Sequence, residues 1–414
     1  MTRREAFSAA ALLGVAAPQN LRAAEPLPDT TLFERDPERY WKRIREEQFF
    51  LPDWRAFLNN GSLGVTPKPV FEAVVDYMKR AAGLLMDEYP RWGYETLDEH
   101  RAEMAEFLGC RRDELAFTHN ATEALSVIAN GIDMKAGDEV VITDLEHPSG
   151  KSPWRLKQAR YGISVREVAV PLPPRDPAQL ADLLVSAIGP RTKVLMFSGI
   201  LSPTGTVMPV RQVCDAARAK GVISIVDGAH MNGQMPLKLN QLGCDYYAGS
   251  PHKWMFAPAG CGILYGRPEM LDKLWPSIVT GEWDNKELGA ARFMKIGTNN
   301  RAIMEGMIAG LRFMKQIGPE RIYARIHQQA KETRRKMAAL GFLELLTPDD
   351  GRLYASLVTI RFPKNADLGP LWEEVKRRRI WVSAGQQVRL SSHIHTRPED
   401  VDSFVEAIKL KVRA

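Results

Sequence analysis

The chain has 414 residues, of which 45% are hydrophobic and 26% are charged, and its formal net charge is +6. This is the composition of a globular protein long enough for one large core and a smaller one. The charge surplus is small, and basic and aromatic residues do not cluster, so we expect no nucleic-acid or membrane partner.

The N-terminus resembles an export signal. Arg3-Arg4 precedes an Ala- and Leu-rich stretch over 9–17, and Leu21-Arg22-Ala23-Ala24 offers a small-residue cleavage site. This pattern is typical of a twin-arginine signal, so we expect residues 1–24 to be one and the protein to be exported, for example to the periplasm. The alternative is a poorly ordered N-terminal helix. The apolar run is too short to span a membrane, and no later stretch qualifies.

Cysteine usage predicts neither disulfides nor a metal site. The four cysteines are Cys110, Cys214, Cys244 and Cys261. None forms a C-x-x-C pair, and no histidine lies at metal-ligand spacing. We therefore expect buried free thiols.

The first third of the chain predicts helices around one short strand. Residues 36–50 are charged and aromatic, which indicates a surface helix, and 56–64 reads as a strand entering a tight glycine turn. Apolar positions at Val70, Val74, Val75 and Met78 predict a helix over 67–83. A second helix is expected over 94–108, ended by Gly109.

From residue 115 onward, apolar strands alternate with helices. Strands are expected at 115–118, 139–143, 165–170, 193–197 and 222–226, and helices at 123–130, from 152, 177–188 and 210–220. Nearly continuous apolar strands separated by helices predict an α/β fold, with a mostly parallel sheet covered on both faces. In such sheets ligands bind beyond the carboxyl ends of the strands.

The C-terminal part predicts a compact α+β unit. A long helical stretch at 300–340 is followed by a strand at 353–362, a helix at 371–379, strands at 380–382 and 387–390, and a helix at 398–412. We therefore expect a large domain over 66–300 and a small one built from 25–65 and 301–414.

Several polar residues follow the predicted strands, and Lys253 in Ser250-Pro251-His252-Lys253-Trp254 is the central one. Pyridoxal phosphate (PLP) needs a lysine for its aldehyde and an acid that keeps its pyridine nitrogen protonated. Lys253 fits the first role. Asp227, which ends a buried strand, fits the second, since a carboxylate there would otherwise need another partner. The alternatives are a surface lysine and a turn or helix-capping aspartate.

Other residues fit the faces and the phosphate of the same cofactor. His147 could stack on the ring and assist proton transfer, or be a loop histidine. His230 could bond near a cofactor oxygen, or be a satisfied core histidine. A helix start at Asn120-Ala121-Thr122 suits a phosphate, although it also reads as a simple N-cap. The remaining candidates are Ala229 on the ring face and the phosphate donors Ser250, His252 and Gly297-Thr298.

Arg389 is the candidate for the substrate carboxylate. It lies between apolar neighbours in Val388-Arg389-Leu390, in a predicted strand of the small domain. A bidentate guanidinium is the usual partner of a carboxylate. The alternative is a solvated arginine on an edge strand.

Together these residues resemble the class V aminotransferase-like PLP enzymes of fold type I, over nearly the whole chain after residue 24. The matching motifs are 59–64 (Asn-Asn-Gly-Ser-Leu-Gly), 120–123 (Asn-Ala-Thr-Glu), 146–147 (Glu-His), 227–230 (Asp-Gly-Ala-His), 250–253 (Ser-Pro-His-Lys) and 297–298 (Gly-Thr). The Asp-Gly-Ala-His motif and Ser-Pro-Thr-Gly-Thr at 202–206 most resemble the isopenicillin N epimerase-like branch.

The resemblance implies a role for each candidate. Lys253 would bind the cofactor covalently, Asp227 would pair with the ring nitrogen, and His147 and Ala229 would flank the ring. Ala121, Thr122, Ser250 and His252 would hold the phosphate, with Thr298 reaching the phosphate of a neighbouring subunit, because the family's active sites lie at a homodimer interface. His230 and Ser202 are further cofactor-binding candidates, and Arg389 and Asn60 are the candidates for the amino-acid substrate.

The sequence also departs from relatives. Ser202 stands where many of them carry an asparagine that contacts the ring hydroxyl. No cysteine follows Cys261, which argues against the persulfide chemistry of cysteine desulfurases.

We therefore expect a PLP enzyme that acts at the Cα of an amino acid, with racemisation, β-elimination and transamination left open. The alternatives are a non-catalytic periplasmic binding protein of the same fold and a sugar aminotransferase, which would not need Arg389.

Overall fold

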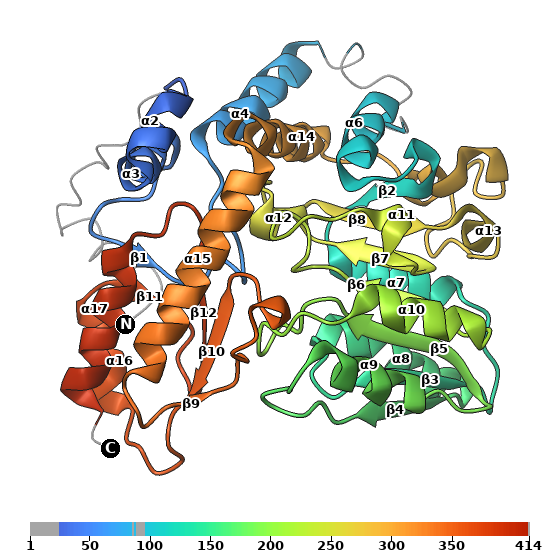
Figure 1. Cartoon of the computed structure of the whole chain (residues 1–414). Helices are drawn as coiled ribbons and strands as arrows, with labels where there is room; N and C mark the ends of the chain where they lie inside the picture. Colours follow the sequence, from blue (N-terminus) through green and yellow to red (C-terminus); the bar gives the residue numbers. More distant parts are fainter. Residues whose placement is uncertain (1–24, 85–86, 88–95, 413–414) are drawn as a thin grey trace, which may run out of the picture.

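The computed structural model describes residues 25–84, 87 and 96–412. Its centre is a seven-stranded sheet in the order β2-β8-β7-β6-β5-β3-β4 (Figure 1). The strands are β2 Leu115–Thr118, β3 Glu139–Thr143, β4 Ser164–Val168, β5 Thr192–Ser198, β6 Ile223–Asp227, β7 Tyr246–Gly249 and β8 Gly262–Gly266. Within this sheet β8 runs antiparallel to both of its neighbours, and the other pairs are parallel. The carboxyl ends of the remaining strands therefore share one edge.

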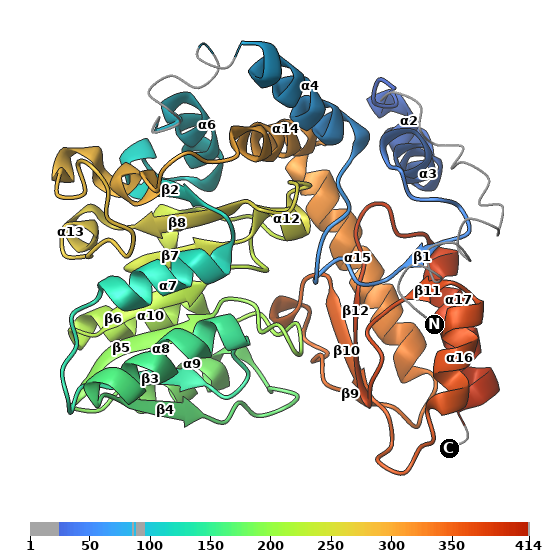
Figure 2. The same cartoon turned by 180° about the vertical axis from the view of Figure 1, so that it is seen from behind.

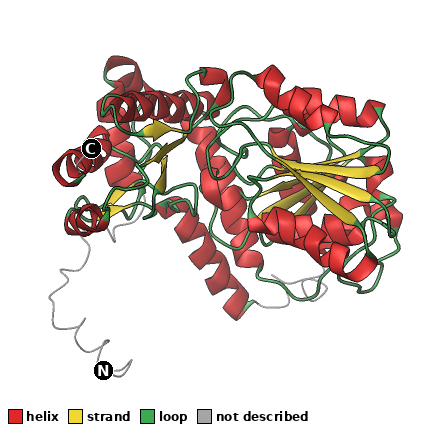
Figure 3. Cartoon of the chain, turned by 90° about the horizontal axis from the view of Figure 1, so that it is seen from below, coloured by secondary structure: helices red, strands yellow, loops and turns green. Residues whose placement is uncertain are grey.

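Helices cover both faces of this sheet, as the view from below shows (Figure 3). α7 and α8 pack together on one face (Figure 2), and α9 packs with α10, which lies on the other. Their bounds are α7 Ala121–Gly131, α8 Pro148–Tyr161, α9 Pro177–Ser186 and α10 Val210–Ala219. The predicted α/β fold with a mostly parallel covered sheet is confirmed.

Alternation along the strands explains why both faces are covered. In β5, Leu195 and Phe197 belong to one apolar core, and Val194 and Met196 belong to the core on the opposite face. Successive side chains of a strand point to opposite faces, so a continuous apolar run needs a cover on each side.

The C-terminal part forms a second body beside this sheet. It holds the antiparallel sheet β12-β10-β9, and β11 pairs in parallel with β1 from the N-terminal segment. The elements are α2 Thr30–Arg35, α3 Pro37–Gln48, β1 Ala56–Phe57, β9 Glu344–Leu345, β10 Leu357–Arg361, α16 Gly369–Arg377, β11 Ile380–Trp381, β12 Gln387–Ser391 and α17 Pro398–Lys411.

Two long helices connect the bodies. α14 (Arg301–Ile317) packs on α4 (Lys68–Gly83), and α15 (Pro319–Ala338) runs along the small sheets (Figure 1). Gly318, with φ of +100°, separates them, so the single helix predicted over 300–340 is in fact two. The remaining elements are α6 Asp98–Leu108, α11 Leu239–Leu242, α12 Pro251–Trp254, α13 Pro268–Leu271 and the 3₁₀ helices Arg112–Glu114, Lys286–Met294 and Gly351–Leu353.

Several sequence predictions need correction. The 36–50 helix is not a surface helix, because one face of α3 is buried, including Tyr40 and Ile44. Met78 was expected on the apolar face of its helix, but it is 56% exposed. The helix expected from residue 152 begins at Pro148, and β7, β8 and β9 were not predicted. The 353–362 strand is shorter, because a 3₁₀ turn precedes β10.

Other predictions concern what the described residues contain. All four cysteines are free. Within the described ranges there is no metal-binding group of His, Cys, Asp and Glu, and no helix long and apolar enough to cross a membrane. The predicted export signal at 1–24 and the first residues of the helix predicted at 94–108 lie outside the described residues.

Candidate active site

A cavity of about 360 Å³ lies at the carboxyl edge of the large sheet. It is lined by most residues singled out from the sequence, namely Ala121, Thr122, His147, Ser202, Asp227, Ala229, His230, Ser250, His252 and Lys253. The rule that ligands bind beyond strand ends therefore located the cavity. Asn60, Thr298 and Arg389 do not line it.

Lys253 lies in α12, a single helical turn after β7, and residues distant in sequence hold this turn. The amide of Gly64 donates to the carbonyl of His252 at 3.0 Å. Asn60 Nδ2 donates to the carbonyl of Lys253 at 2.7 Å, and His393 Nε2 donates to that of Trp254 at 3.1 Å. Three consecutive carbonyls are thus bound from outside the turn, which fixes the backbone that carries the lysine.

This arrangement corrects the role expected for Asn60. Its side chain is buried, and its oxygen accepts a hydrogen bond from His395 Nε2 at 3.2 Å. Its nitrogen donates to the Lys253 carbonyl. Asn60 therefore holds the lysine turn instead of facing the cavity. A Cβ on Gly64 would lie 2.4 Å from the Lys253 carbonyl oxygen, so only glycine permits this approach.

Asp227 ends β6 with its carboxylate almost fully buried. Its Oδ1 accepts from the amide of Ala229 at 2.9 Å. Burial raises the pKa of Asp227, against the opposing effects of the Ala229 hydrogen bond, Lys253 and His147. Its other oxygen has no hydrogen-bond partner within the described residues. This oxygen can therefore accept a hydrogen bond from a donor group bound in the cavity.

Lys253 and His147 both face the cavity as potential bases. Burial lowers the pKa of Lys253 to about 8, with Asp227 opposing this effect and Arg389 adding to it. Burial and then Lys253 lower the pKa of His147. Both shifts favour the neutral form that a proton acceptor needs, and Lys253 is about half neutral at pH 8. His147 also caps α8 by accepting from the amide of Ser149.

The other end of the cavity suits an anion. The amide of Ala121, first residue of α7, donates to Ser250 Oγ at 3.1 Å. In the described part of the chain, the amide and hydroxyl of Thr122 have no hydrogen-bond partner, so both remain available. His119, which was not predicted, lines the same end and contacts Glu123 and Asn299 through its two ring nitrogens.

Arg389 contacts two residues that line the cavity. Its Nη1 donates to the carbonyl and hydroxyl of Ser202 at 2.9 and 2.8 Å, and its Nη2 donates to Ser62 Oγ at 3.1 Å. Burial lowers the pKa of Arg389 to about 10. No carboxylate among the described residues pairs with this guanidinium. Ser202, a candidate for cofactor binding, lines the cavity and also binds Arg389.

Glu146 is a buried acid to which the sequence assigned no role of its own. It accepts from Thr143 Oγ1 at 2.6 Å, from the amide of Ser198 at 3.1 Å and from Ser198 Oγ at 2.5 Å. Burial raises the pKa of Glu146 to about 7, and nearby Asp227 adds to this effect. With a pKa of about 7, Glu146 is about half protonated near neutral pH, so it carries less negative charge beside Asp227 than an ordinary glutamate would.

We predict that Glu146→Gln makes stability less dependent on pH. The pKa of Glu146 in the folded chain, about 7, exceeds its ordinary value of 4.5. Its contribution is therefore fully present below pH 4.5 and is lost as the pH rises through about 7. Between pH 5 and 8 the unfolding free energy of the wild type should fall relative to Glu146→Gln by up to about 3 kcal/mol, measured by urea unfolding.

The control for this measurement is Glu99→Gln on the exposed surface of α6, which should track the wild type. Parallel curves for the wild type and Glu146→Gln would contradict the assignment of a neutral buried acid.

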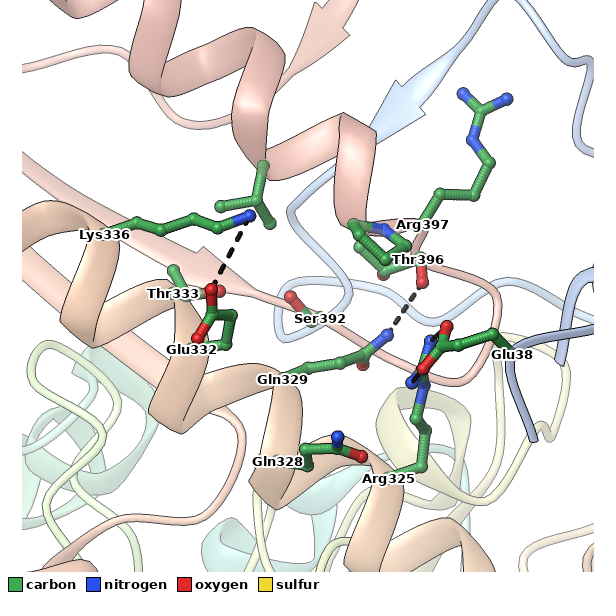
Figure 4. Close-up of a pocket in the computed structure, with 12 residues that line it drawn as sticks. Glu38, Arg325, Gln328, Gln329, Glu332, Thr333, Lys336, Ser392, Thr396 and Arg397 are labelled. Atoms are coloured by element: carbon green, nitrogen blue, oxygen red, sulfur yellow. Dashed lines mark hydrogen bonds and ion pairs between the residues drawn. The ribbon is translucent and has the colours of Figure 1, made fainter. Parts of the chain in front are cut away.

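A second cavity, of about 120 Å³, lies away from these residues (Figure 4). It lies between α15 and the loop before α17, where Gln329 Nε2 donates to the carbonyl of Thr396 at 2.7 Å. No residue predicted for the site lines it. The chemistry therefore belongs to the cavity around Lys253.

The residues of the first cavity fit PLP by their donor and acceptor properties. The open oxygen of Asp227 suits a protonated ring nitrogen, the amine of Lys253 suits an aldehyde, and the Thr122 end suits a phosphate. The backbone directly after Asp227 packs closely on Tyr247. A Cβ on Gly228 would lie 2.0 Å from the Tyr247 ring, so this packing fixes the position of the Asp227 carboxylate.

Comparison with known proteins identifies the family. Residues 56–405 match the model of the family described as Aminotransferase class-V. The chain is similar to an isopenicillin N epimerase of Streptomyces clavuligerus, at 31% identity over 85% of this chain and 93% of that enzyme. It is similar to another from Amycolatopsis lactamdurans, at 32% identity over 89% and 98% of the two chains.

Cysteine desulfurases also match. A probable cysteine desulfurase of Pyrococcus abyssi is 26% identical over 86% of this chain and 94% of its own. The apo structure of a cysteine desulfurase from Thermococcus onnurineus NA1 superposes with a TM-score of 0.76 at 24% identity, over 94% of this chain and 99% of that one. This last likeness shows the fold.

Proposed function

The chain belongs to the class V aminotransferase family of PLP-dependent enzymes, and we propose that it removes and returns a proton at the Cα of an amino-acid substrate, as an epimerase. The observation that carries this proposal is Arg389, a partly buried guanidinium that contacts Ser202 and Ser62 of the Lys253 cavity and has no carboxylate partner among the described residues. The carboxylate of an amino-acid substrate would supply the missing ion-pair partner of Arg389.

The residues of the cavity divide the work. When bound, PLP supplies an electron sink for the charge that develops at Cα. Asp227 holds the proton on the ring nitrogen, and Ser250 and Thr122 lie where the phosphate would bind. Arg389 orients the substrate through its carboxylate, while Lys253 and His147 take and give the Cα proton. Two bases in one cavity suit removal and return of a proton at the same carbon.

The test is to incubate the holoenzyme with single L-amino acids in D₂O. Epimerisation predicts a D-isomer with deuterium at Cα and no release of keto acid, sulfide or ammonia. Stoichiometric keto acid would instead indicate transamination, and pyruvate with ammonia would indicate β-elimination. A panel in which no amino acid changes the cofactor spectrum would favour the binding-protein alternative.

A cysteine desulfurase is the second candidate, because such enzymes are among the relatives. Persulfide transfer needs a reactive thiolate near the substrate. No cysteine lines the cavity, and burial raises the pKa of Cys110 to about 12 and that of Cys214 to about 12. Cys244 and Cys261 are fully buried. These thiols do not support desulfuration.

We predict that Arg389→Ala raises KM for the amino acid by about 10²-fold, because one charge-assisted pair is lost. Arg389→Lys should recover part of the loss, since lysine restores the charge without the bidentate fork. Steady-state kinetics separate KM from kcat. Arg361→Ala on the neighbouring strand β10, whose side chain pairs with Glu344, is the matched control. An unchanged KM in Arg389→Ala would support the sugar aminotransferase alternative.

Export and the homodimer remain predictions. The exposed Thr298 lies outside the cavity of its own chain, next to Asn299, which contacts His119 of the cavity wall. This position is compatible with a contact to a second subunit.

A further inference from the structure

His230 lies between Trp254 and the amine of Lys253, and all three positions are well defined by packing. The imidazole and the indole are almost fully buried. Trp254 Nε1 lies 3.3 Å from His230 Nδ1, and His230 Nε2 lies 3.2 Å from Lys253 Nζ. Each ring nitrogen of His230 therefore has one neighbour.

The donor properties of these groups decide where the protons lie. An indole N–H can only donate, so His230 Nδ1 must be the acceptor. The proton of a neutral His230 is then on Nε2, which points at Lys253 Nζ. An ammonium at Lys253 would face this N–H with its own protons, whereas a neutral amine accepts from it.

We propose that Trp254 and His230 form a relay that fixes the imidazole in the Nε2–H tautomer, and that this N–H orients the free amine of Lys253 and favours its neutral form. Trp254 is a positioning residue, because it acts through His230. The sequence placed His230 only near a cofactor oxygen and gave Trp254 no role.

The charges around the relay agree with a neutral imidazole. His230 is faced by Lys253 and His252 from α12, by His147 from the start of α8, and by Arg389 from β12. These groups and burial lower the pKa of His230 well below its ordinary value. Asp227 at the end of β6 is the acid near Lys253 and favours its charged form, and the relay opposes it.

The relay deepens the proposed function and rests on it for one point, the use of Lys253 as a proton acceptor. An amine must be neutral before it can take a proton. The relay supplies this form once substrate has released the lysine. The tautomer itself is a property of the folded chain and is measurable without turnover.

The first test is NMR of the holoenzyme labelled with ¹⁵N-histidine, in which the His230 resonances are those lost in His230→Gln. We expect the pattern of a neutral ring protonated on Nε2, unchanged between pH 6 and 8. A ring protonated on Nδ1, or on both nitrogens, would overturn the proposal. The variant serves only to assign the resonances, and the protonation pattern itself is read in the wild-type chain.

The second test removes the indole donor with Trp254→Phe. His230 can then protonate Nδ1 and present a lone pair to Lys253, which favours the ammonium. In the full-length chain freed of cofactor, trace labelling with acetic anhydride at pH 7, followed by mass spectrometry of the Lys253 peptide, should be about tenfold slower, as for a pKa raised by one unit.

The matched control is Trp154→Phe, another fully buried tryptophan that contacts neither His230 nor Lys253 in the hydrogen-bond network. It should lose similar packing and leave the Lys253 titration unchanged. Equal labelling of Lys253 in Trp254→Phe and the wild type, or an equal shift in Trp154→Phe, would overturn the relay. Absence of epimerase activity in the wild type, with the labelling shift still observed in Trp254→Phe, would count against the proposed function alone.

Discussion

Lys253→Ala is expected to remove the visible absorbance band of the purified protein and to lower turnover by at least about 10³-fold. We expect this amine to bind the cofactor aldehyde and to act as a base in the cavity that it lines. The variant should fold, because burial disfavours the charged amine and its pKa is lowered to about 8. An absorbance scan and a thermal melt of the same sample separate loss of the cofactor bond from loss of structure.

The control for this prediction is Lys220→Ala, an exposed lysine at the end of α10. It should keep the band and the activity. A visible band that persists in Lys253→Ala would show that another residue holds the cofactor.

Asp227→Asn should lower kcat by about 10²–10⁴-fold with little change in KM. Asparagine keeps the size of the side chain and an oxygen for the Ala229 amide, which lies 2.9 Å from Asp227 Oδ1. It loses the negative charge that retains the proton on the ring nitrogen. Steady-state kinetics with the preferred amino acid measure the effect, and Asp227→Glu, which keeps the charge, should recover part of the rate.

The same variant has a predicted sign for stability. The pKa of Asp227 is raised by burial above its ordinary value of 3.8, so its contribution is present below that pH and is lost as the pH rises through the folded-state pKa. At pH 7 the cofactor-free Asp227→Asn chain should therefore be at least as stable as the wild type in urea. A less stable, fully active variant would contradict the assignment of Asp227.

Much of the site could be predicted because strand ends are readable in sequence. β6 is an unbroken apolar run that stops at Asp227, and Glu146-His147 follow a similar run, so their meeting at one sheet edge follows from topology. β7 and β8 were missed, since Tyr-Tyr-Ala-Gly and Gly-Ile-Leu-Tyr-Gly are short and rich in glycine. Without β8, the antiparallel strand within the sheet could not be predicted.

The contacts that support the site could not be predicted from the sequence. His393 and His395 belong to a loop after β12, and nothing in their local pattern indicates the lysine turn. The relay through Trp254 depends on distances between side chains from different elements. Glu146 was visible as a motif residue, but only its burial in the structure shows that its pKa is raised to about 7.

The three carbonyls of the lysine turn also set an order of events during biosynthesis. Asn60 is 193 residues from Lys253, and His393 follows Trp254 by 139. The lysine is translated long before the loop that carries His393 leaves the ribosome, and contacts of such sequence separation form late in folding. The backbone of the lysine turn therefore lacks one of its three outside hydrogen bonds until the C-terminal part of the chain has been made and has folded.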